Sequence, residues 1–289
     1  MPPLFFEEIM NNINIKNLII EFDLLDEDGA IKSRKRVIDD VSFSIAEGEF
    51  VCVLGKNGSG KSTLAKTLNS LIIPTSGDVE VYGLNTKIED NIPKIRQLVG
   101  MAFQNPDNQI VASIVEEDIA FGLENIGIES LEIRNRIDDA MKNLEIYNLK
   151  DSIVSKLSGG QKQKVSIAGI LAMKPKVIVL DEPTSMIDKV GRIDLLDTVK
   201  RLNKEENITI ILISHYIEEI TYADKVILLN HGKVAEIDTP DNILLKSDLL
   251  YDAGLDMPYI AKIATELKKR GKNLKGNETK VSELCRYLK

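Results

Sequence analysis

The sequence lacks several features that would each indicate a class of protein. No apolar run approaches the roughly 18 residues that a membrane-spanning helix needs, and the first eight residues have neither the basic start nor the apolar length of a signal peptide. The two cysteines, Cys52 and Cys285, form no disulfide framework and no metal-binding spacing, which is typical of a protein in a reducing cytoplasm. The net charge of -8 disfavours binding to nucleic acid. With 289 residues, 43% of them hydrophobic, the chain can bury a sizeable globular core.

Apolar segments alternate with amphipathic ones along the chain, and this order predicts an α/β fold. Segments 177–180 and 208–213 have no polar face, so we expect strands that are buried on both sides of a parallel sheet. Further strands are expected at 13–22, 37–45 and 49–54, a hairpin at 226–237, and helices at 61–71, 131–144 and 160–173. The charged segment 23–36 is expected to be a solvent-exposed loop, and the polar segment after Pro240 a small helical appendage.

A glycine-rich loop lies between the strand expected at 49–54 and the helix expected at 61–71. It reads Gly55-Lys56-Asn57-Gly58-Ser59-Gly60-Lys61-Ser62-Thr63 and fits the pattern G-x-x-x-x-G-K-[ST] of a P-loop. The glycines let backbone N–H groups point at phosphate oxygens, and the N-terminus of the helix adds partial positive charge. Lys61 supplies an ammonium for the β- and γ-phosphates, and Ser62 a hydroxyl for Mg²⁺. The loop therefore predicts a nucleoside triphosphate and Mg²⁺ as ligands.

Two carboxylates, Asp181 and Glu182, end the apolar run at 177–180. Asp181 stands where the run stops, so its carboxylate can reach a metal ion held at the P-loop. Glu182 is turned the other way by the alternation of strand side chains, and it could accept a proton from an attacking water. The alternative is a strand end whose charges simply face solvent.

A second glycine-rich segment, Leu157-Ser158-Gly159-Gly160-Gln161, opens the helix expected at 160–173. Ser158 can cap this helix, and the glycines leave its first amides open to a phosphate. An ordinary capped helix start is the alternative. With two phosphate-facing loops, the chain could bind two nucleotides or contribute half of two sites.

The order of these motifs resembles that of the ATP-binding subunit of an ABC transporter over residues 13–240. The shared set is the P-loop, Gln104, the segment 157–161, Asp181-Glu182, Ser185 to Asp188, and His215. The resemblance implies an ABC-type P-loop NTPase domain with a mixed sheet core, an antiparallel β layer and a helical subdomain at about 105–170, followed by the appendage at 241–289. It also implies head-to-tail dimers, in which each ATP lies between one chain's P-loop and Ser158, Gly159, Gly160 and Gln161 of the other chain.

The resemblance also implies roles for single residues. Gln104 would sense the γ-phosphate and share the Mg²⁺ with Ser62 and Asp181. Glu182 would be the general base, and His215 would hold the γ-phosphate and the attacking water. Asp188 would belong to a loop that faces the opposite site.

Three further positions bear on the resemblance, and a fourth lies outside it. Phe22 occupies the segment in which the family places an aromatic ring on adenine, although a place in the core is an alternative. The family usually has an acidic residue where Tyr216 follows the histidine, and proline where Lys189 follows Asp188. His231 lies in the expected hairpin turn and is interpreted as a surface residue.

The segments 103–109 and 115–125 are similar to those of ATPases from energy-coupling factor (ECF) transporters, nearest the first of their two ATPase paralogues. That subfamily implies ATP-driven uptake of a vitamin or a transition-metal ion, from the cytoplasmic face of the cell membrane. Its partners would be a second ATPase subunit (a paralogue or a second copy), a transmembrane scaffold and a substrate-binding membrane subunit, and no nucleic acid. Glu116, Glu117 and Asp118 would then help to bind a basic coupling helix of the scaffold. The alternatives are another class of ABC transporter or a soluble ABC ATPase.

Overall fold

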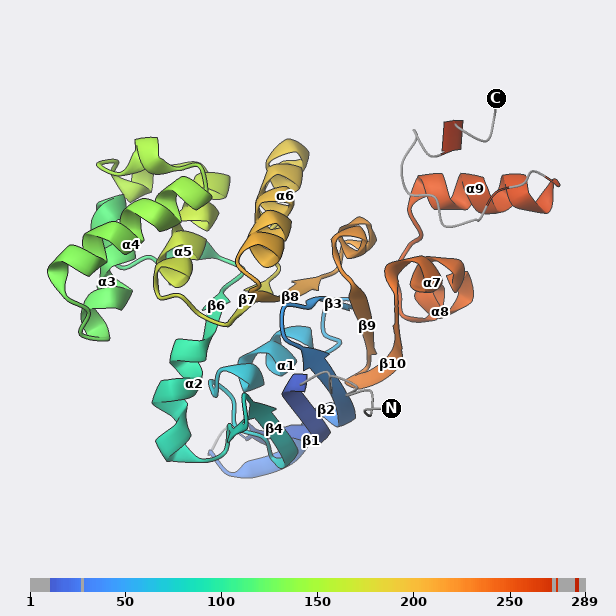
Figure 1. The fold of residues 1–289 in the computed structure, drawn as a ribbon. Helices are drawn as coiled ribbons and strands as arrows, with labels where there is room; N and C mark the ends of the chain where they lie inside the picture. Colours follow the sequence, from blue (N-terminus) through green and yellow to red (C-terminus); the bar gives the residue numbers. More distant parts are fainter. Residues whose placement is uncertain (1–10, 27–28, 272–273, 275–283, 286–289) are drawn as a thin grey trace, which may run out of the picture.

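The computed structural model describes residues 11–26, 29–271, 274, 284 and 285 and arranges them around two sheets (Figure 1). The central sheet has the strand order β10-β9-β3-β8-β7-β6. Its parallel strands are β3 (Phe50–Leu54), β6 (Val99–Ala102), β7 (Val177–Asp181), β8 (Thr209–Ser214) and β9 (Lys225–Asn230), and β10 (Lys233–Asp238) is antiparallel to β9. Both the predicted parallel core and the predicted hairpin are confirmed.

The second sheet is antiparallel and has the order β2-β1-β4-β5. Its strands are β1 (Asn11–Leu25), β2 (Ile31–Ala46), β4 (Ser76–Val81) and β5 (Leu84–Asn85). Together the sheets confirm the predicted α/β fold with a mixed sheet and an antiparallel β layer.

The prediction of a loop at 23–36 is wrong for most of that segment, because β1 and β2 extend into it. Asp23 pairs with Arg34 and Glu21 with Arg36 in the antiparallel register. Arg34 Nε lies 3.0 Å from Asp23 Oδ1, and Arg36 Nε lies 2.8 Å from Glu21 Oε1. Charges that indicated a loop therefore compensate one another across the two strands, which stabilises an exposed hairpin.

Helices cluster at both edges of the central sheet, and others flank the sheets separately (Figure 1). One group beside β6 comprises α3 (Val115–Asn125), α4 (Ser130–Asn143) and α5 (Gly159–Ala172), and another, at the β10 edge, comprises α7 (Pro240–Leu245), α8 (Ser247–Asp252) and α9 (Tyr259–Lys269). The sheets are flanked by α1 (Lys61–Leu68), α2 (Ile92–Leu98) and α6 (Lys189–Glu205). The first helix ends three residues before the predicted Leu71, because the backbone turns left-handed at Ser70 with φ 56°.

The central sheet separates two hydrophobic cores. Phe50, Cys52 and Leu54 of β3 face the larger core, which contains side chains of α3 to α6. Val51 and Val53 alternate with them and face the smaller core, which is shared with α1 and the antiparallel sheet. Because the parallel strands end at one edge of the sheet, the P-loop after β3, the carboxylates at the end of β7 and His215 after β8 meet there.

The C-terminal helices divide between two clusters. Ile243 and Leu244 of α7 and Leu250 of α8 belong to the larger core, whereas Ala264 of α9 packs in a small cluster with Leu284. Among the helices in the described part of the chain, none combines the length and apolar character that crossing a bilayer requires.

Candidate active site

The P-loop joins β3 to α1, and two of its glycines have backbone angles that side chains rarely adopt. Gly58 has φ +81° and Gly60 has φ +103°. A Cβ on Gly60 would lie 2.7 Å from Ile38 Cδ1 and 3.0 Å from the Val37 carbonyl oxygen. Both the conformation and the close approach of β2 therefore require glycine at position 60.

Lys61 is buried at the start of α1 and bends back over its own loop. Its Nζ donates to the carbonyl oxygens of Gly55 at 2.8 Å and Lys56 at 3.1 Å. Burial lowers the pKa of Lys61, and the nearby carboxylates of Glu182 and Asp181 oppose that shift. The ammonium is thus held in the hollow of the loop where phosphate oxygens would lie.

Ser62 and Asp181 meet as the sequence predicts. The Ser62 hydroxyl donates to Asp181 Oδ1 at 2.8 Å, and both line a cavity of about 430 Å³ together with Gln104. Burial raises the pKa of Asp181, although the hydrogen bond from Ser62 opposes this shift. A hydroxyl, a carboxylate and an amide oxygen are hard oxygen donors, so this residue set fits Mg²⁺.

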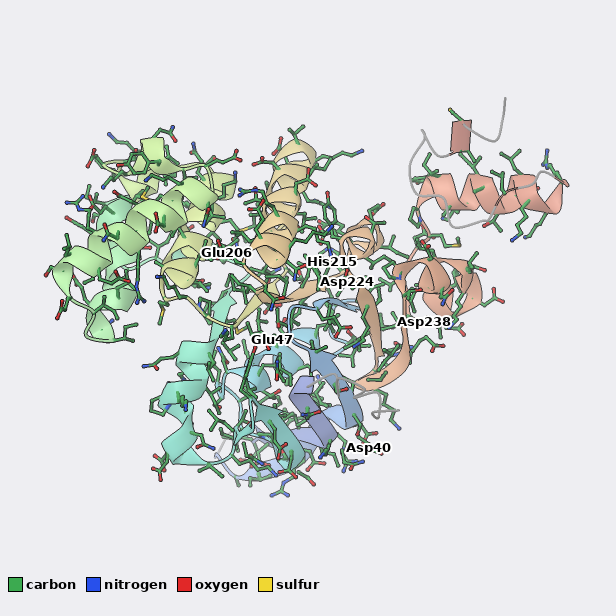
Figure 2. All side chains as sticks on the ribbon, viewed as in Figure 1. Asp40, Glu47, Glu206, His215, Asp224 and Asp238 are labelled. Atoms are coloured by element: carbon green, nitrogen blue, oxygen red, sulfur yellow. The ribbon has the colours of Figure 1, made fainter. Side chains whose placement is uncertain are left out.

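Glu182 is the point at which the other predicted catalytic residues meet. Gln104 Nε2 donates to Glu182 Oε2 at 3.0 Å, and His215 Nδ1 lies 3.3 Å from the same oxygen. Lys61 Nζ lies 3.6 Å from Glu182 Oε1. Figure 2 shows His215 near the middle of the molecule, between α6 and the central sheet. Gln104, Glu182 and His215 follow β6, β7 and β8, and Lys61 opens α1 after the P-loop that follows β3, which explains how residues far apart in sequence reach one carboxylate.

A cavity of about 510 Å³ opens over the P-loop and Glu182. It is lined by residues 57, 58 and 60–63 of the loop, by Gln104, by Lys35 and Arg36 of β2, and by His231 of the β9–β10 turn. The cationic side chains would complement a triphosphate. Phe22 is 41% exposed and does not line this cavity. Its cross-strand partner, Lys35, does line the cavity. Stacking of Phe22 on adenine stays a prediction.

The second glycine-rich segment lies in a different cavity. Ser158 caps α5 as predicted: its hydroxyl accepts from the Gln161 N–H at 3.3 Å, and its own N–H donates to Gln161 Oε1 at 2.9 Å. Ser158, Gly159, Gly160 and Gln161 line a cavity of about 440 Å³, with Asp188 on its other wall. Within one chain, the structure therefore keeps this segment apart from the P-loop.

The comparisons with known proteins agree with this geometry. A family model described as ABC transporter matches residues 38–185, slightly more than half of the chain. The ECF transporter ATP-binding protein EcfA1 of Clostridium novyi is 45% identical over 278 residues, which are 96% of this chain and 98% of that protein. Its counterpart in Caldanaerobacter subterraneus is 47% identical over 252 residues, covering 87% and 91% of the two chains. The chain belongs to the ATP-binding proteins of ECF transporters.

Solved structures of ABC cassettes have the same fold. The cbiO1 protein of Clostridium perfringens, described as part of the ABC transporter complex cbiONQ, superposes with a TM-score of 0.73 at 32% identity, over 88% of this chain and 98% of that one. The cassette MJ0796, seen as a post-hydrolysis dimer with ADP and Pi, gives 0.71 at 28% identity, over 79% and 98%. The predicted ABC-type P-loop NTPase fold is confirmed, and the chain is an ABC-type ATP hydrolase.

The sequence of this ABC ATPase did not indicate every residue at the nucleotide cavity. Lys35 and Arg36 lie in the segment for which the sequence predicts a loop, and His231 lies where it predicts a surface residue. His231 is exposed, but it lines the cavity with its Nε2 3.4 Å from Lys56 Nζ. The pairing of β9 with β3 brings the β9–β10 turn to the P-loop, and no local pattern in the sequence indicates this pairing.

Proposed function

We propose that this chain hydrolyses ATP to drive the uptake of a vitamin or a transition-metal ion, as one ATPase subunit of an ECF importer. The convergence of Lys61, Gln104 and His215 on Glu182 supports the catalytic part of the proposal. The 45% identity to an ECF transporter ATP-binding protein over nearly the whole chain supports the transport part.

In the proposed mechanism, Glu182 accepts the proton of the attacking water. Its carboxylate is oriented by the hydrogen bond from Gln104, and His215 beside it holds the water and the γ-phosphate in line. Lys61 exchanges its two carbonyl partners for phosphate oxygens and places its charge against the reacting group.

Ser62, Asp181 and Gln104 are the residues that would hold Mg²⁺. Their side chains already line one cavity. The bound ion would neutralise charge that develops on the phosphate oxygens. All three oxygen donors come from this chain, and β7 brings the Asp181 carboxylate to Ser62 and Gln104.

The second ATPase subunit, a paralogue or another copy of this chain, would complete each site. Ser158, Gly159, Gly160 and Gln161 do not line this chain's P-loop cavity, which supports their proposed contact with ATP held by the partner. Closure of such a dimer would exclude water from the phosphates and strengthen every polar contact with them.

Helix α3 offers the proposed contact with a membrane scaffold, and its three acidic residues differ in availability. Glu116 Oε1 lies 2.6 Å from Arg134 Nη1 and 3.6 Å from Lys150 Nζ. Asp118 Oδ1 accepts from the N–H of Val111 at 2.7 Å and closes the preceding loop. Glu117 is the exposed one of the three. We therefore assign the attraction of a basic coupling helix mainly to Glu117.

Isolation of the chain with its native partners tests this proposal. The tagged chain is purified from detergent-solubilised membranes of its own host, and the accompanying proteins are identified. We expect a second ABC ATPase, a transmembrane scaffold and a substrate-binding membrane protein, consistent with a peripheral place on the cytoplasmic face. Glu117→Lys should lower the recovery of the scaffold while leaving ATP binding intact, and Glu117→Gln, which removes the charge without reversing it, should have a smaller effect.

Two results would count against the proposal at different levels. Full recovery of the scaffold with Glu117→Lys would show that Glu117 does not contribute to the docking surface. Purification without any membrane protein would contradict the transport function and favour a soluble ABC ATPase.

A further inference from the structure

Tyr216, the residue after His215, stacks on an arginine from another element. The guanidinium carbon of Arg192 lies 3.7 Å from the centroid of the Tyr216 ring. The rings of His215 and Tyr216 are themselves 4.1 Å apart between centroids and tilted by 38°. An arginine on an aromatic face at this distance makes a cation–π contact. The His215 loop is therefore attached to α6 through one ring.

Arg192 is also the nearest cation to a buried carboxylate. Its Nε lies 3.8 Å from Glu219 Oε1, and Glu219 is 2% exposed. Glu219 Oε1 accepts a hydrogen bond from Thr184 Oγ1 at 2.6 Å. A buried carboxylate without a counter-charge is strongly unfavourable. The ion pair with Glu219 therefore restrains the position of the Arg192 side chain, in addition to its contact with Tyr216.

These contacts form a closed circuit around the hydrolytic carboxylate. Thr184 follows Glu182 by two residues, and His215 Nδ1 lies 3.3 Å from Glu182 Oε2. The circuit thus runs from Glu182 through Thr184, Glu219, Arg192 and Tyr216 to His215, and returns to Glu182.

Arg192 lies in the first turn of α6, next to the cavity that is lined by Ser158 to Gln161, termed the signature cavity. Its N–H donates to the Asp188 carbonyl oxygen at 2.9 Å. Asp188 and Gly191 line the cavity that contains Ser158 to Gln161, whereas Glu182 lines the P-loop cavity. The circuit consequently joins the wall of the P-loop cavity to the wall of the signature cavity. These cavities are the two half-sites that this chain would contribute to a dimer, the P-loop half-site and the signature half-site.

We infer that Tyr216 is a positioning residue: through Arg192 it fixes the His215 ring relative to the first turn of α6, so that the P-loop half-site and the signature half-site change geometry together. The inference rests on the proposed role of His215 at the γ-phosphate. Tyr216 meets Arg192 through its ring face, so the effect depends on the ring and not on the hydroxyl.

The test compares Tyr216→Leu with Tyr216→Phe in the intact ATPase dimer or transporter complex. Tyr216→Leu keeps apolar bulk but removes the ring face, and Tyr216→Phe removes the hydroxyl alone. We expect Tyr216→Leu to lower kcat for ATP hydrolysis about tenfold, with KM and the affinity of each chain for ATP unchanged. Tyr216→Phe should keep the wild-type kcat. Equal loss in both variants, or wild-type kcat in Tyr216→Leu, would overturn the inference.

Arg192→Gln provides an independent variant if Tyr216→Leu does not fold. It should lower kcat by a similar factor, and the double variant should be no worse than either single one, because both remove the same contact. Effects that multiply would show two separate roles and would also overturn the inference. His215→Ala is measured alongside these variants. If His215→Ala retains turnover, the proposed role of His215 at the γ-phosphate is wrong. If His215→Ala is inactive while Tyr216→Leu has the wild-type kcat, only the positioning role of Tyr216 is wrong.

Discussion

Glu182 combines an unusual backbone with a crowded carboxylate. Its φ of 47° lies in the left-handed region, which costs a non-glycine residue roughly 1–3 kcal/mol. The contacts with Gln104, His215 and Lys61 hold the side chain in this conformation. Strain of this kind persists where surrounding structure enforces it, and here it directs a carboxylate from the end of β7 into the nucleotide cavity.

Replacing Glu182 with Gln tests the role of this carboxylate. The amide keeps the size of the side chain but cannot accept a proton from water, so we expect kcat to fall at least about 100-fold. ATP affinity should stay near the wild-type value, since Lys61 and the P-loop are unchanged, and ATP should then accumulate a closed dimer. Steady-state hydrolysis, nucleotide titration and size-exclusion chromatography with ATP measure the three effects.

Glu218→Gln is the matched control, because Glu218 is an exposed glutamate in the segment after His215. It should leave hydrolysis unchanged. Near-normal turnover by Glu182→Gln would refute the assignment of Glu182 as general base.

Among the elements, the β9–β10 turn supports the P-loop directly. The N–H of Gly232 donates to the Ser59 carbonyl oxygen at 3.0 Å, and the Gly232 carbonyl accepts from the Asp39 N–H at 2.8 Å. Gly232 has φ +77°, and a Cβ there would lie 2.4 Å from the Val37 carbonyl oxygen. The turn is thus fixed between the P-loop and β2 with no room for a side chain.

We therefore expect Gly232→Ala to displace the turn and to weaken ATP binding. The clash with rigid backbone adds to a conformational cost of about 1–2 kcal/mol for a non-glycine residue in the left-handed region, so thermal stability should also fall. Nucleotide titration and thermal unfolding measure the two effects. Gly127→Ala is the control, since Gly127 has φ +74° but nothing within 4 Å of a Cβ. It should lose some stability and keep its ATP affinity, and equal ATP affinities in the two variants would contradict the supporting role of the turn.

The elements that the sequence predicted correctly are those whose signals are local. The apolar runs of β7 and β8, the P-loop between a strand and a helix, and the cap at Ser158 each depend on residues close together in the chain. The contacts that were missed join distant segments, such as Gly232 with Ser59 and Arg192 with Tyr216. The sequence does not indicate the extended β1–β2 hairpin, because its many charges are typical of a loop and are neutralised only when the two strands pair.

At the scale of the whole molecule, the two cavities explain why one chain carries two phosphate-facing loops. The P-loop and Lys61 line one cavity, and Ser158 to Gln161 line the other. Neither cavity combines both loops, which agrees with the proposal that each chain contributes one half to each of two nucleotide sites. Dimerisation is then part of the proposed catalytic mechanism, and the contacts around Arg192 are the structural connection between the halves.

The division between the ATPase domain at 13–240 and the appendage at 241–289 stays a prediction, and the packing of the C-terminal helices shows how to test it. The side chains of Ile243, Leu244 and Leu250 lie at 0%, 1% and 0% exposure in the larger core. Removal of large buried aliphatic side chains costs about 2–5 kcal/mol each, and a domain is stable by only about 5–15 kcal/mol. Ile263 of α9, by contrast, is 47% exposed.

We expect a variant that ends at residue 258 to fold and to hydrolyse ATP, because α7 and α8 remain in place. A variant that ends at residue 239 should be unstable or insoluble, since the surface that those helices cover becomes exposed to water. Thermal unfolding of the purified variants is the measurement, with Leu250→Ala and Ile263→Ala in the full-length chain as paired controls. Leu250→Ala should lose about 2–5 kcal/mol of unfolding free energy, and Ile263→Ala much less. If the chain ending at 239 is as stable as the full-length protein, α7 and α8 are separable from the ATPase core.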